Sequence, residues 1–352
     1  MFEAPPLQPT RSHVPPLDGL RGIAVLLVLW AHFPPDLGGN TIRVMNRIFQ
    51  PGYLGVDIFF VLSGFLITRI LLYGRFNNKP LSNFLIRRAF RIFPIYYLLI
   101  LLLLFIEPGE YLFWCATYLS NFVFSFDLSP NPMRHTWSLC VEEHFYMVWP
   151  LLIHFAAVRW LRPTAIGIAL LGIVLAILAA LLSGVVPLDY LLYRGTPFRA
   201  TSLALGGLFA LYEPALGIGT RRPWAFAGAF FVPAVICALS AIGIGDPWLQ
   251  SLKMIGFAFM SSAIFLAALG VGSLSPRLGA VLSGGALAYT GRISYGIYLY
   301  HFPIFYATGV LDHEAPAPWP MTLLAVALTF VVATSSFYLI EKPLLKYAAR
   351  FR

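Results

Sequence analysis

Two residues that could do proton chemistry stand inside the first apolar run of the chain, LDGLRGIAVLLVLWAHF at 17–33. Arg21 and His32 enclose ten uncharged residues. In a helix, eleven positions return a side chain to within about 20° of its direction, about 16.5 Å further along the axis. Both side chains therefore belong to one polar stripe, which must face a bundle interior rather than lipid. His32 is a candidate general base, and a structural, hydrogen-bonded histidine is the alternative.

A carboxylate follows in the second apolar run, GYLGVDIFFVLSGFLITR at 52–69. Asp57 has apolar neighbours, and a buried carboxylate must find a cation or take up a proton. Asp57 and His32 both lie near the outer ends of their predicted helices, so a contact between them is geometrically possible. The alternative is a helix-initiating role for Asp57.

Arginines begin the third apolar run, FLIRRAFRIFPIYY at 84–97. The three- and four-residue spacings place Arg91 on one helix face with Arg88 or with Arg87. Paired guanidinium groups can clamp a phosphate. On charge alone, a cluster at the cytoplasmic surface that contacts anionic lipid is favoured.

Two glutamates stand in the stretch HTWSLCVEEHFYMVWP at 135–150. One glutamate there could orient a histidine or accept a proton. Adjacent helical side chains point about 100° apart, so only one of Glu142 and Glu143 is expected to face a given site. The spacing does not suit a metal site at the three histidines of this region, His135, His144 and His154.

A late apolar stretch, GRISYGIYLYHFPIF at 291–305, places Ser294, Tyr298 and His301 along one side of a helix. Tyrosines at membrane interfaces form aromatic belts, which is the alternative for Tyr298. His301 is less easily explained in this way. The final apolar run closes with SFYLIEKPLLK, where Glu341 and Lys342 mark the predicted exit and Pro343 is expected to stop the helix.

The composition indicates the kind of protein that must position these residues. Apolar residues make up 59% of the 352 and charged residues only 11%, against about 25% in soluble domains. The mean hydropathy is +0.77. Runs of about 20 apolar residues recur from one end to the other. We therefore expect an all-α, polytopic transmembrane helix bundle, forming a single domain over 1–352.

The charge pattern predicts how the chain crosses the membrane. Lysine and arginine accumulate in cytoplasmic loops, and the rule favours about ten spans with both termini cytoplasmic. A short cytoplasmic tail (1–16), an extracytoplasmic excursion (107–137) and a basic cytoplasmic tail (341–352) complete this topology. The predicted spans are 17–35, 52–73, 88–106, 138–158, 164–184, 199–213, 223–243, 251–272, 289–310 and 319–340.

Two further features exclude other classes. The net charge of +9 is explained by this orientation rule, so no nucleic-acid partner is expected. The three cysteines, Cys115, Cys140 and Cys237, have apolar neighbours, and no two of them form a CxxC motif. We therefore interpret them as packing residues.

Six motifs, in this order, resemble those of the integral-membrane acyltransferase family 3, and they extend over nearly the whole chain. That family includes O-acetyltransferases of bacterial surface polysaccharides and acyltransferases that modify macrolides. The resemblance implies a multi-pass protein of the bacterial inner membrane that uses acyl-CoA. The motifs are LDGLRGIAVLLVLWAH, GYLGVDIFFVLSGFLI, RRAFR, TWSLCVEEHFY, ISYGIYLYH and YLIEKP.

The resemblance also implies roles for individual residues. His32 is similar to the catalytic base and Arg21 to its motif partner, while the acidic partner of His32 is left open between Asp57 and Glu142. We assign donor binding to Arg69, Arg88 and Arg91. Substrate binding is assigned to Trp137, Tyr298 and His301. The sequence departs from the family at His144, where glutamine is frequent, and in showing no fused extracytoplasmic domain after the last span.

The resulting hypothesis is O-acyl transfer, most simply of acetyl from cytoplasmic acetyl-CoA, to a hydroxyl of a carbohydrate. The acceptor is a surface polysaccharide, its lipid-linked precursor or a small glycosylated metabolite. No metal and no permanently bound cofactor are expected. Membrane lipid is the expected surrounding, and the oligomeric state is left open. A proton-coupled transporter or flippase is the alternative from another class.

Overall fold

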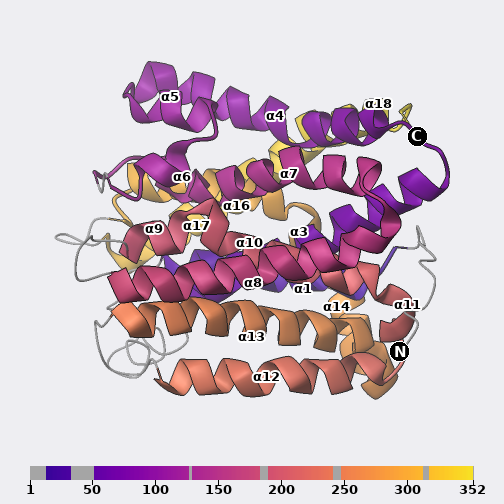
Figure 1. Cartoon of the computed structure of the whole chain (residues 1–352). Coiled ribbons are helices and arrows are strands. Elements are labelled where there is room, and N and C mark those ends of the chain that lie inside the picture. Colours follow the sequence, from indigo (N-terminus) through magenta and orange to yellow (C-terminus); the bar gives the residue numbers. More distant parts are fainter. Residues whose placement is uncertain are drawn as a thin grey trace.

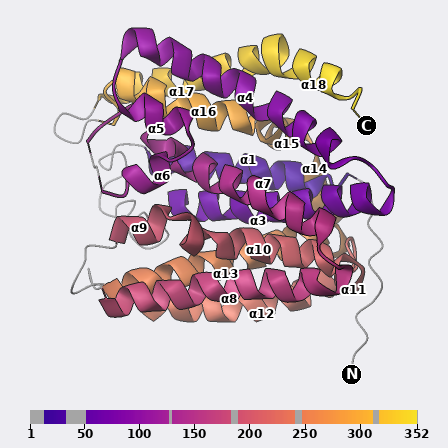
Figure 2. The same ribbon diagram turned by 45° about the horizontal axis from the view of Figure 1, so that its top comes forward.

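The computed structural model describes residues 13–32, 51–126, 129–182, 189–240, 247–311 and 317–351. Every regular element within these ranges is a helix, which confirms the all-α prediction for this part of the chain. The long helices lie side by side in one bundle, with short helices at its two ends (Figures 1 and 2).

The long helices follow the predicted apolar runs. They are α1 (Pro16–Ala31), α3 (Pro51–Phe76), α4 (Leu81–Ile106), α7 (Trp137–Phe155), α8 (Val158–Leu182), α10 (Thr196–Leu211), α12 (Arg222–Ser240), α13 (Pro247–Leu274), α16 (Ser294–Ala307) and α17 (Trp319–Ser336). The short ones are α5 (Tyr111–Ala116), α6 (Ser120–Val123), η2 (Arg134–Thr136), α9 (Asp189–Arg194), α11 (Glu213–Leu216), α14 (Pro276–Ser283), α15 (Gly285–Arg292), η3 (Phe337–Glu341) and α18 (Lys342–Ala348).

Within the described ranges, five helices are both long and apolar enough to cross a bilayer. They are Gly52–Phe76, Leu81–Ile106, Val158–Ala179, Ser251–Leu274 and Trp319–Ala348. The chain is therefore a multi-pass membrane protein. Helices such as α16, with 14 residues, are shorter than a full span, so the number of ten spans and the location of the termini stay predictions.

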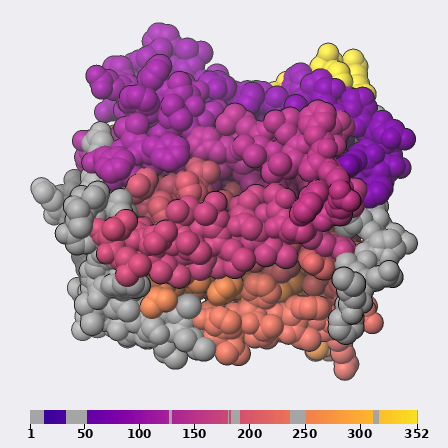
Figure 3. Space-filling view, in the orientation of Figure 1, coloured from indigo at the N-terminus to yellow at the C-terminus, as the bar shows by residue number. Residues whose placement is uncertain are grey.

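The outer surface suits a lipid surrounding. α8 crosses the middle of the face in Figure 3. Leucine, isoleucine and valine side chains of this helix are exposed, among them Ile166, Leu170, Leu171 and Val174. An exposed apolar surface of this extent marks contact with lipid or another apolar partner. Polar and charged side chains are instead buried between the helices, as the first sequence argument required.

α3 and α10 pack with their backbones in direct contact. A Cβ atom on Gly64 would overlap the carbonyl oxygen of Leu203, and one on Gly206 would overlap that of Val61. Glycine at these crossings lets two helices approach more closely than any other residue allows. The close approach brings the first turns of α3 against α10, where the buried charges described below meet.

The basic loops gather at one end of the bundle. Arg75, at the end of α3, donates to the carbonyl of Ala156 just after α7, and Arg162 in α8 donates to the carbonyl of Leu211 at the end of α10. Figure 1 shows α11, α14 and α18 at this same end, and α5, α6 and α9 at the other. The sequence rule had assigned these loops to one side of the membrane.

The end of the last long helix corrects one prediction. Pro343 does not stop it, because the wide turn η3 follows α17 and leads directly into α18. Pro343 lies in the first turn of α18. Proline is accepted in a first turn, since the amide groups there have no intrahelical acceptor to lose.

Candidate active site

A cavity of about 510 Å³ opens among the ends of α1, α3, α4 and α7 and runs inward to α16. Its lining residues on α3 extend from Val56 to Arg75, about 28 Å along the helix axis. Two carboxylates, Asp18 and Glu142, line it. Seven cationic side chains line it as well: Arg21, Arg69, Arg75, Lys79, Arg87, Arg88 and Arg91. The cavity therefore favours a polyanionic ligand.

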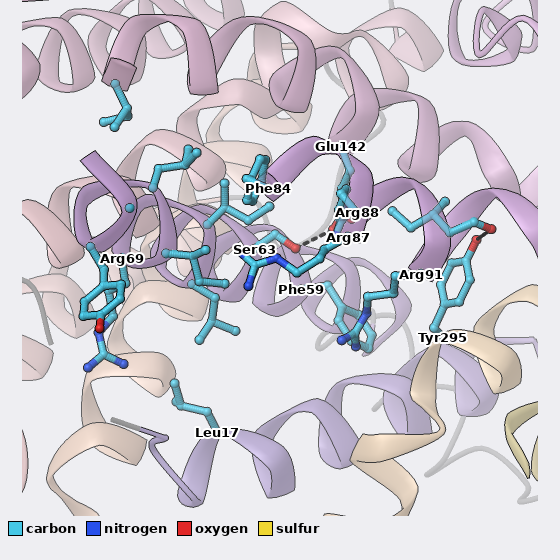
Figure 4. Close-up of a pocket in the computed structure, with 18 of the residues that line it drawn as sticks. Leu17, Phe59, Ser63, Arg69, Phe84, Arg87, Arg88, Arg91, Glu142 and Tyr295 are labelled. Atoms are coloured by element: carbon cyan, nitrogen blue, oxygen red, sulfur yellow. Dashed lines mark hydrogen bonds and ion pairs between the residues drawn. The ribbon is translucent and has the colours of Figure 1, made fainter. Parts of the chain in front are cut away.

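The arginines of α4 face this cavity together, as the spacing in RRAFR predicted. Figure 4 shows Arg87, Arg88 and Arg91 grouped beside Glu142, with Arg69 apart from them. The Arg88 guanidinium lies 3.7 Å from the centre of the Tyr146 ring and 3.4 Å from Glu142. Arg91 makes no ion pair with any described residue, so its charge is available to a ligand.

Glu142 is the centre of a polar network in the middle of the cavity. Its carboxylate accepts hydrogen bonds from the Ser63 hydroxyl at 2.9 Å and from the Tyr146 hydroxyl at 2.9 Å, in addition to the contact with Arg88. The adjacent Glu143 lies 3.9 Å from Arg88 and does not line the cavity among the residues described there. Glu142 is thus positioned to orient Arg88.

The inner end of the cavity reaches Tyr298. Its hydroxyl donates to the main-chain carbonyl of His135 at 2.7 Å and shares a 2.6 Å hydrogen bond with Ser138. The Tyr298 ring lies 5.4 Å from the ring of His135 and 5.6 Å from that of His301. Tyr298 thus lines the inner end of the cavity and lies against two buried histidines, which are not themselves lining residues.

Three histidines from distant parts of the sequence meet around Phe302. The ring of His301 lies 5.1 Å from His32 and 5.1 Å from His135. Phe302 lies 5.2 Å from His32 and stacks on His135 at 5.0 Å. This group of His32, His135 and His301 is the histidine cluster. No group of three or more potential ligands in the described ranges is arranged to hold a metal ion.

Main-chain carbonyls determine the tautomers in the cluster. Nδ1 of His32 lies 2.9 Å from the carbonyl oxygen of Val28, and Nδ1 of His301 lies 2.7 Å from that of Tyr298. A carbonyl only accepts, so both Nδ1 atoms carry the proton and both Nε2 atoms keep their lone pairs. Nε2 of His32 is thus the nitrogen that can accept a proton.

The two acidic residues that the sequence offered as partners of His32 contact other side chains in the structure. Asp57 is fully buried and accepts hydrogen bonds from Arg199 at 2.9 Å and from Ser202 at 2.6 Å. Glu142 is engaged by Ser63, Tyr146 and Arg88, as described above. The orienting group of His32 is instead the Val28 carbonyl one turn earlier in α1.

Three other residues that the sequence offered as site candidates contact different partners from one another. The Arg69 guanidinium lines the cavity but pairs with both carboxylate oxygens of Glu213, at 2.7 and 2.8 Å. Trp137 packs at 4.6 Å against Tyr193 and lies 5.7 Å from Arg199, so it encloses the buried ion pair. Arg21 lines the cavity, 3.9 Å from Asp18.

Sequence reasoning missed His135, Ser63 and Arg199 as members of these networks. His135 was considered only as a metal ligand, because its relation to Tyr298 and His301 spans more than 160 residues. Arg199 opens an apolar run in the same way as Arg21, and a search for a cation to neutralise Asp57 would have found it. Nothing in the local pattern distinguishes Ser63 from a packing residue.

The fold and the cavity define a class: a multi-pass membrane protein with a cavity rich in cationic side chains that extends from one end of the bundle to Tyr298, next to buried histidines. Comparison with known proteins makes this specific. Residues 15–340 match the family model described as an acyltransferase domain, and the chain belongs to that family.

Several curated relatives align over nearly the whole chain. The peptidoglycan O-acetyltransferase OatA of Listeria monocytogenes is 30% identical over 96% of this chain and 56% of the relative. YrhL of Bacillus subtilis is 32% identical over 94% and 55%, and the O-acetyltransferase OatA of Staphylococcus aureus is 28% identical over 95% and 57%. The chain spans just over half the length of these relatives. No solved structure matches it.

Proposed function

We propose that this protein transfers an acetyl group from cytoplasmic acetyl-CoA to a hydroxyl of a cell-envelope carbohydrate, with peptidoglycan as the first acceptor to test. The observation that carries the proposal is the continuous cavity, which begins among arginines and ends at Tyr298, whose ring lies 5.6 Å from that of His301 in the histidine cluster. Membership of the acyltransferase family and the names of the relatives support the same reaction. The bacterial cytoplasmic membrane is the proposed location.

Coenzyme A fits the charge and the length of the cavity. Its diphosphate and 3′-phosphate groups are polyanionic, and the cavity is lined by seven cationic side chains against two carboxylates. Arg88 and Arg91 face the cavity from one helix surface and can bind phosphate oxygens with charge-assisted hydrogen bonds. The pantetheine arm then extends along α3 toward Tyr298, and the thioester arrives next to the histidine cluster.

The chemical step requires a base at the inner end. The acceptor hydroxyl gives its proton to Nε2 of His32, and its oxygen attacks the thioester carbonyl carbon. The tetrahedral intermediate collapses by breaking the carbon–sulfur bond, and the coenzyme A thiolate takes the proton from His32. The products are the acetyl ester and free coenzyme A. General-base assistance of this kind contributes about 10²–10⁴-fold in rate.

The remaining polar residues position the reactants. Val28 keeps the His32 lone pair on Nε2. Glu142 holds the Arg88 guanidinium toward the cavity, while Ser63 and Tyr146 hold Glu142. Arg21 adds positive charge beside the path of the donor. No step in this scheme needs a metal ion or a bound cofactor.

The test replaces His32 with alanine. Cells that lack the chromosomal gene are restored with the wild-type protein or with His32→Ala, and ester-linked acetate is released from the isolated envelope by mild alkali. The variant should lower acetylation by about 10²–10⁴-fold. It should also keep its thermal stabilisation by acetyl-CoA in detergent, because the donor phosphates bind at the other end of the cavity. Near-normal acetylation by the variant would contradict the assignment.

A matched control is available on α7. The ring of His144 bonds to Thr196 and stacks on Phe122, outside the cavity and the histidine cluster. His144→Gln should leave acetylation within about twofold of wild type, because a polar substitution at a partly exposed position away from the cavity rarely has a large effect. Mass analysis of the envelope glycans identifies which sugar has lost its acetyl increment.

A further inference from the structure

His135 carries hydrogen-bonding capacity that the protein itself does not use. The residue lies in η2, directly before α7, and its side chain is only 4% exposed. Neither Nδ1 nor Nε2 makes a hydrogen bond of good geometry with a described residue, although main-chain groups of Leu299 and Tyr298 lie near the ring. The ring is nevertheless fixed in place, because it stacks on Phe302 and the Tyr298 hydroxyl holds its main-chain carbonyl.

The imidazole ring of His135 offers a hydrogen-bond donor as well as an acceptor. Burial lowers the pKa of His135 to about 3, with a further lowering from nearby His32. The ring is therefore neutral and carries one N–H and one lone pair. A buried donor without a partner is energetically costly. His135 does not itself line the cavity, but its ring lies 5.4 Å from that of Tyr298, which lines the inner end, so a ligand atom that passes Tyr298 is the candidate acceptor for this N–H.

The polar hydrogens of the other two cluster histidines, of Tyr298 and of Ser138 are already engaged. The Nδ1–H of His32 bonds to Val28 and that of His301 bonds to Tyr298. The single hydroxyl proton of Tyr298 goes to the carbonyl of His135, so Ser138 donates its proton to the Tyr298 oxygen. His135 is the member of the histidine cluster that still has a proton to offer.

We propose that His135 is a catalytic residue whose neutral imidazole N–H stabilises the oxyanion formed when the acceptor oxygen attacks the thioester. This inference rests on the proposed acetyl transfer and adds to it the electrophilic group that His32 cannot supply. The oxygen of the thioester carbonyl gains negative charge as the new carbon–oxygen bond forms. The His135 N–H donates to it throughout and keeps its own proton, while the proton of the acceptor passes to His32 and then to the coenzyme A thiolate.

A neutral imidazole suits this role for two reasons. It donates a hydrogen bond in a site where water is excluded, and such preorganised donors are worth more there than in water. It also neither gains nor loses a proton when it acts as a donor, so the transfer of the acceptor proton is left to His32. The two histidines thus divide the chemistry, with His32 as the base and His135 as the donor.

The experiment uses three substitutions at this position. His135→Phe keeps a flat ring against Phe302 but removes the N–H. His135→Asn and His135→Gln each supply an amide N–H, at reaches that correspond to Nδ1 and to Nε2. Membranes from cells expressing each full-length variant are supplied with acetyl-CoA over a range of concentrations, and acetate esters formed on the endogenous envelope glycans are measured.

We expect His135→Phe to lower kcat by about 10²–10³-fold, the effect of removing one oxyanion donor. The KM for acetyl-CoA should change by less than about threefold, because the phosphates bind at the arginines. At least one amide variant should recover about tenfold or more of the lost rate. The pH dependence of kcat should keep its limb at low pH in all variants, since that limb belongs to His32.

Three outcomes would overturn the inference. One is a His135→Phe enzyme with a kcat within threefold of wild type. Another is equal loss in the phenylalanine, asparagine and glutamine variants when their folded amounts in detergent match wild type, which indicates a packing role. A third is loss of the limb at low pH, which would make His135 the base.

Failure of the proposed function gives a different result. In that case wild-type protein adds no base-releasable acetate over cells that carry an empty vector. The effect of the substitutions is read only against a wild-type signal above that background, so the two failures are distinguishable. His144→Gln serves again as the histidine substitution that leaves kcat unchanged.

Discussion

The buried pair of Asp57 and Arg199 makes a strong prediction about stability. The two side chains are 0% and 2% exposed, and they meet at 2.9 Å. Ser202 gives Asp57 a second hydrogen bond at 2.6 Å, and rings of Phe60, Trp137 and Tyr193 lie 5.3–5.7 Å from the Arg199 guanidinium. We predict that this pair holds α3 against α10 and takes no part in the chemistry.

The expected size of the effect follows from these contacts. Asp57→Leu removes two charge-assisted hydrogen bonds, each worth about 1.5–3 kcal/mol, and leaves the Arg199 charge buried among aromatic rings. Breaking a buried pair by removing one partner costs about 3–5 kcal/mol. Arg199→Met leaves the complementary uncompensated carboxylate and should cost a similar amount. The double variant replaces both charges with apolar groups and should lie within about 2 kcal/mol of wild type.

The assay is a double-mutant cycle. The free energy of unfolding is measured for the wild type, the two single variants and the double variant in mixed micelles of increasing denaturing detergent. Acetyl transfer is measured in membranes for the same four proteins. The coupling energy should exceed about 3 kcal/mol, and the double variant should recover both stability and most of the wild-type acetylation.

Two results would refute this reasoning. A loss of less than about 1 kcal/mol in Asp57→Leu would mean that the pair does not stabilise the crossing of α3 and α10. A double variant as stable as wild type but inactive would give Asp57 a direct role in the reaction, as the sequence motif suggested.

Two further predictions concern the donor and the helix crossing. Arg91→Gln should raise the KM for acetyl-CoA about tenfold with little change in kcat. The Arg91 side chain lines the cavity without an ion pair among the described residues, and the substitution removes one charge-assisted contact with the donor. An unchanged KM would show that Arg91 does not bind the donor. Gly64→Ala should lower the free energy of unfolding by about 1–3 kcal/mol or more, because the added Cβ would overlap the Leu203 carbonyl oxygen in the backbone of α10. The matched control in the same unfolding measurement is Gly228→Ala, where the added Cβ meets open space.

The sequence predicted the features that depend on local periodicity. Apolar runs specified the helices, because a segment in lipid must satisfy its own backbone hydrogen bonds. The eleven-residue spacing in the first run put Arg21 and His32 on the interior stripe, and the spacing in RRAFR put Arg88 and Arg91 on one face toward the cavity. Six motifs in order were enough to identify the family that the comparison later showed.

The prediction about the last helix went wrong for a local reason. Proline was expected to end the helix after Lys342. The wide turn of η3 resets the hydrogen-bond pattern before Pro343, so the proline falls where no bond is lost. A breaker residue alone therefore did not reveal the geometry of the turn that precedes it.

Only the tertiary structure decided which polar groups meet. Asp57 pairs with Arg199, 142 residues away, and Arg69 pairs with Glu213, 144 residues away. His135 reaches the cluster of His32 and His301 because η2 packs against α16. The periodicity of one helix gives the direction of a side chain but not the neighbour that it faces, since that neighbour depends on how all the helices pack. The sequence by itself thus determined a membrane acyltransferase fold with buried charges, and helix packing determined which of those charges pair with one another and which face the cavity.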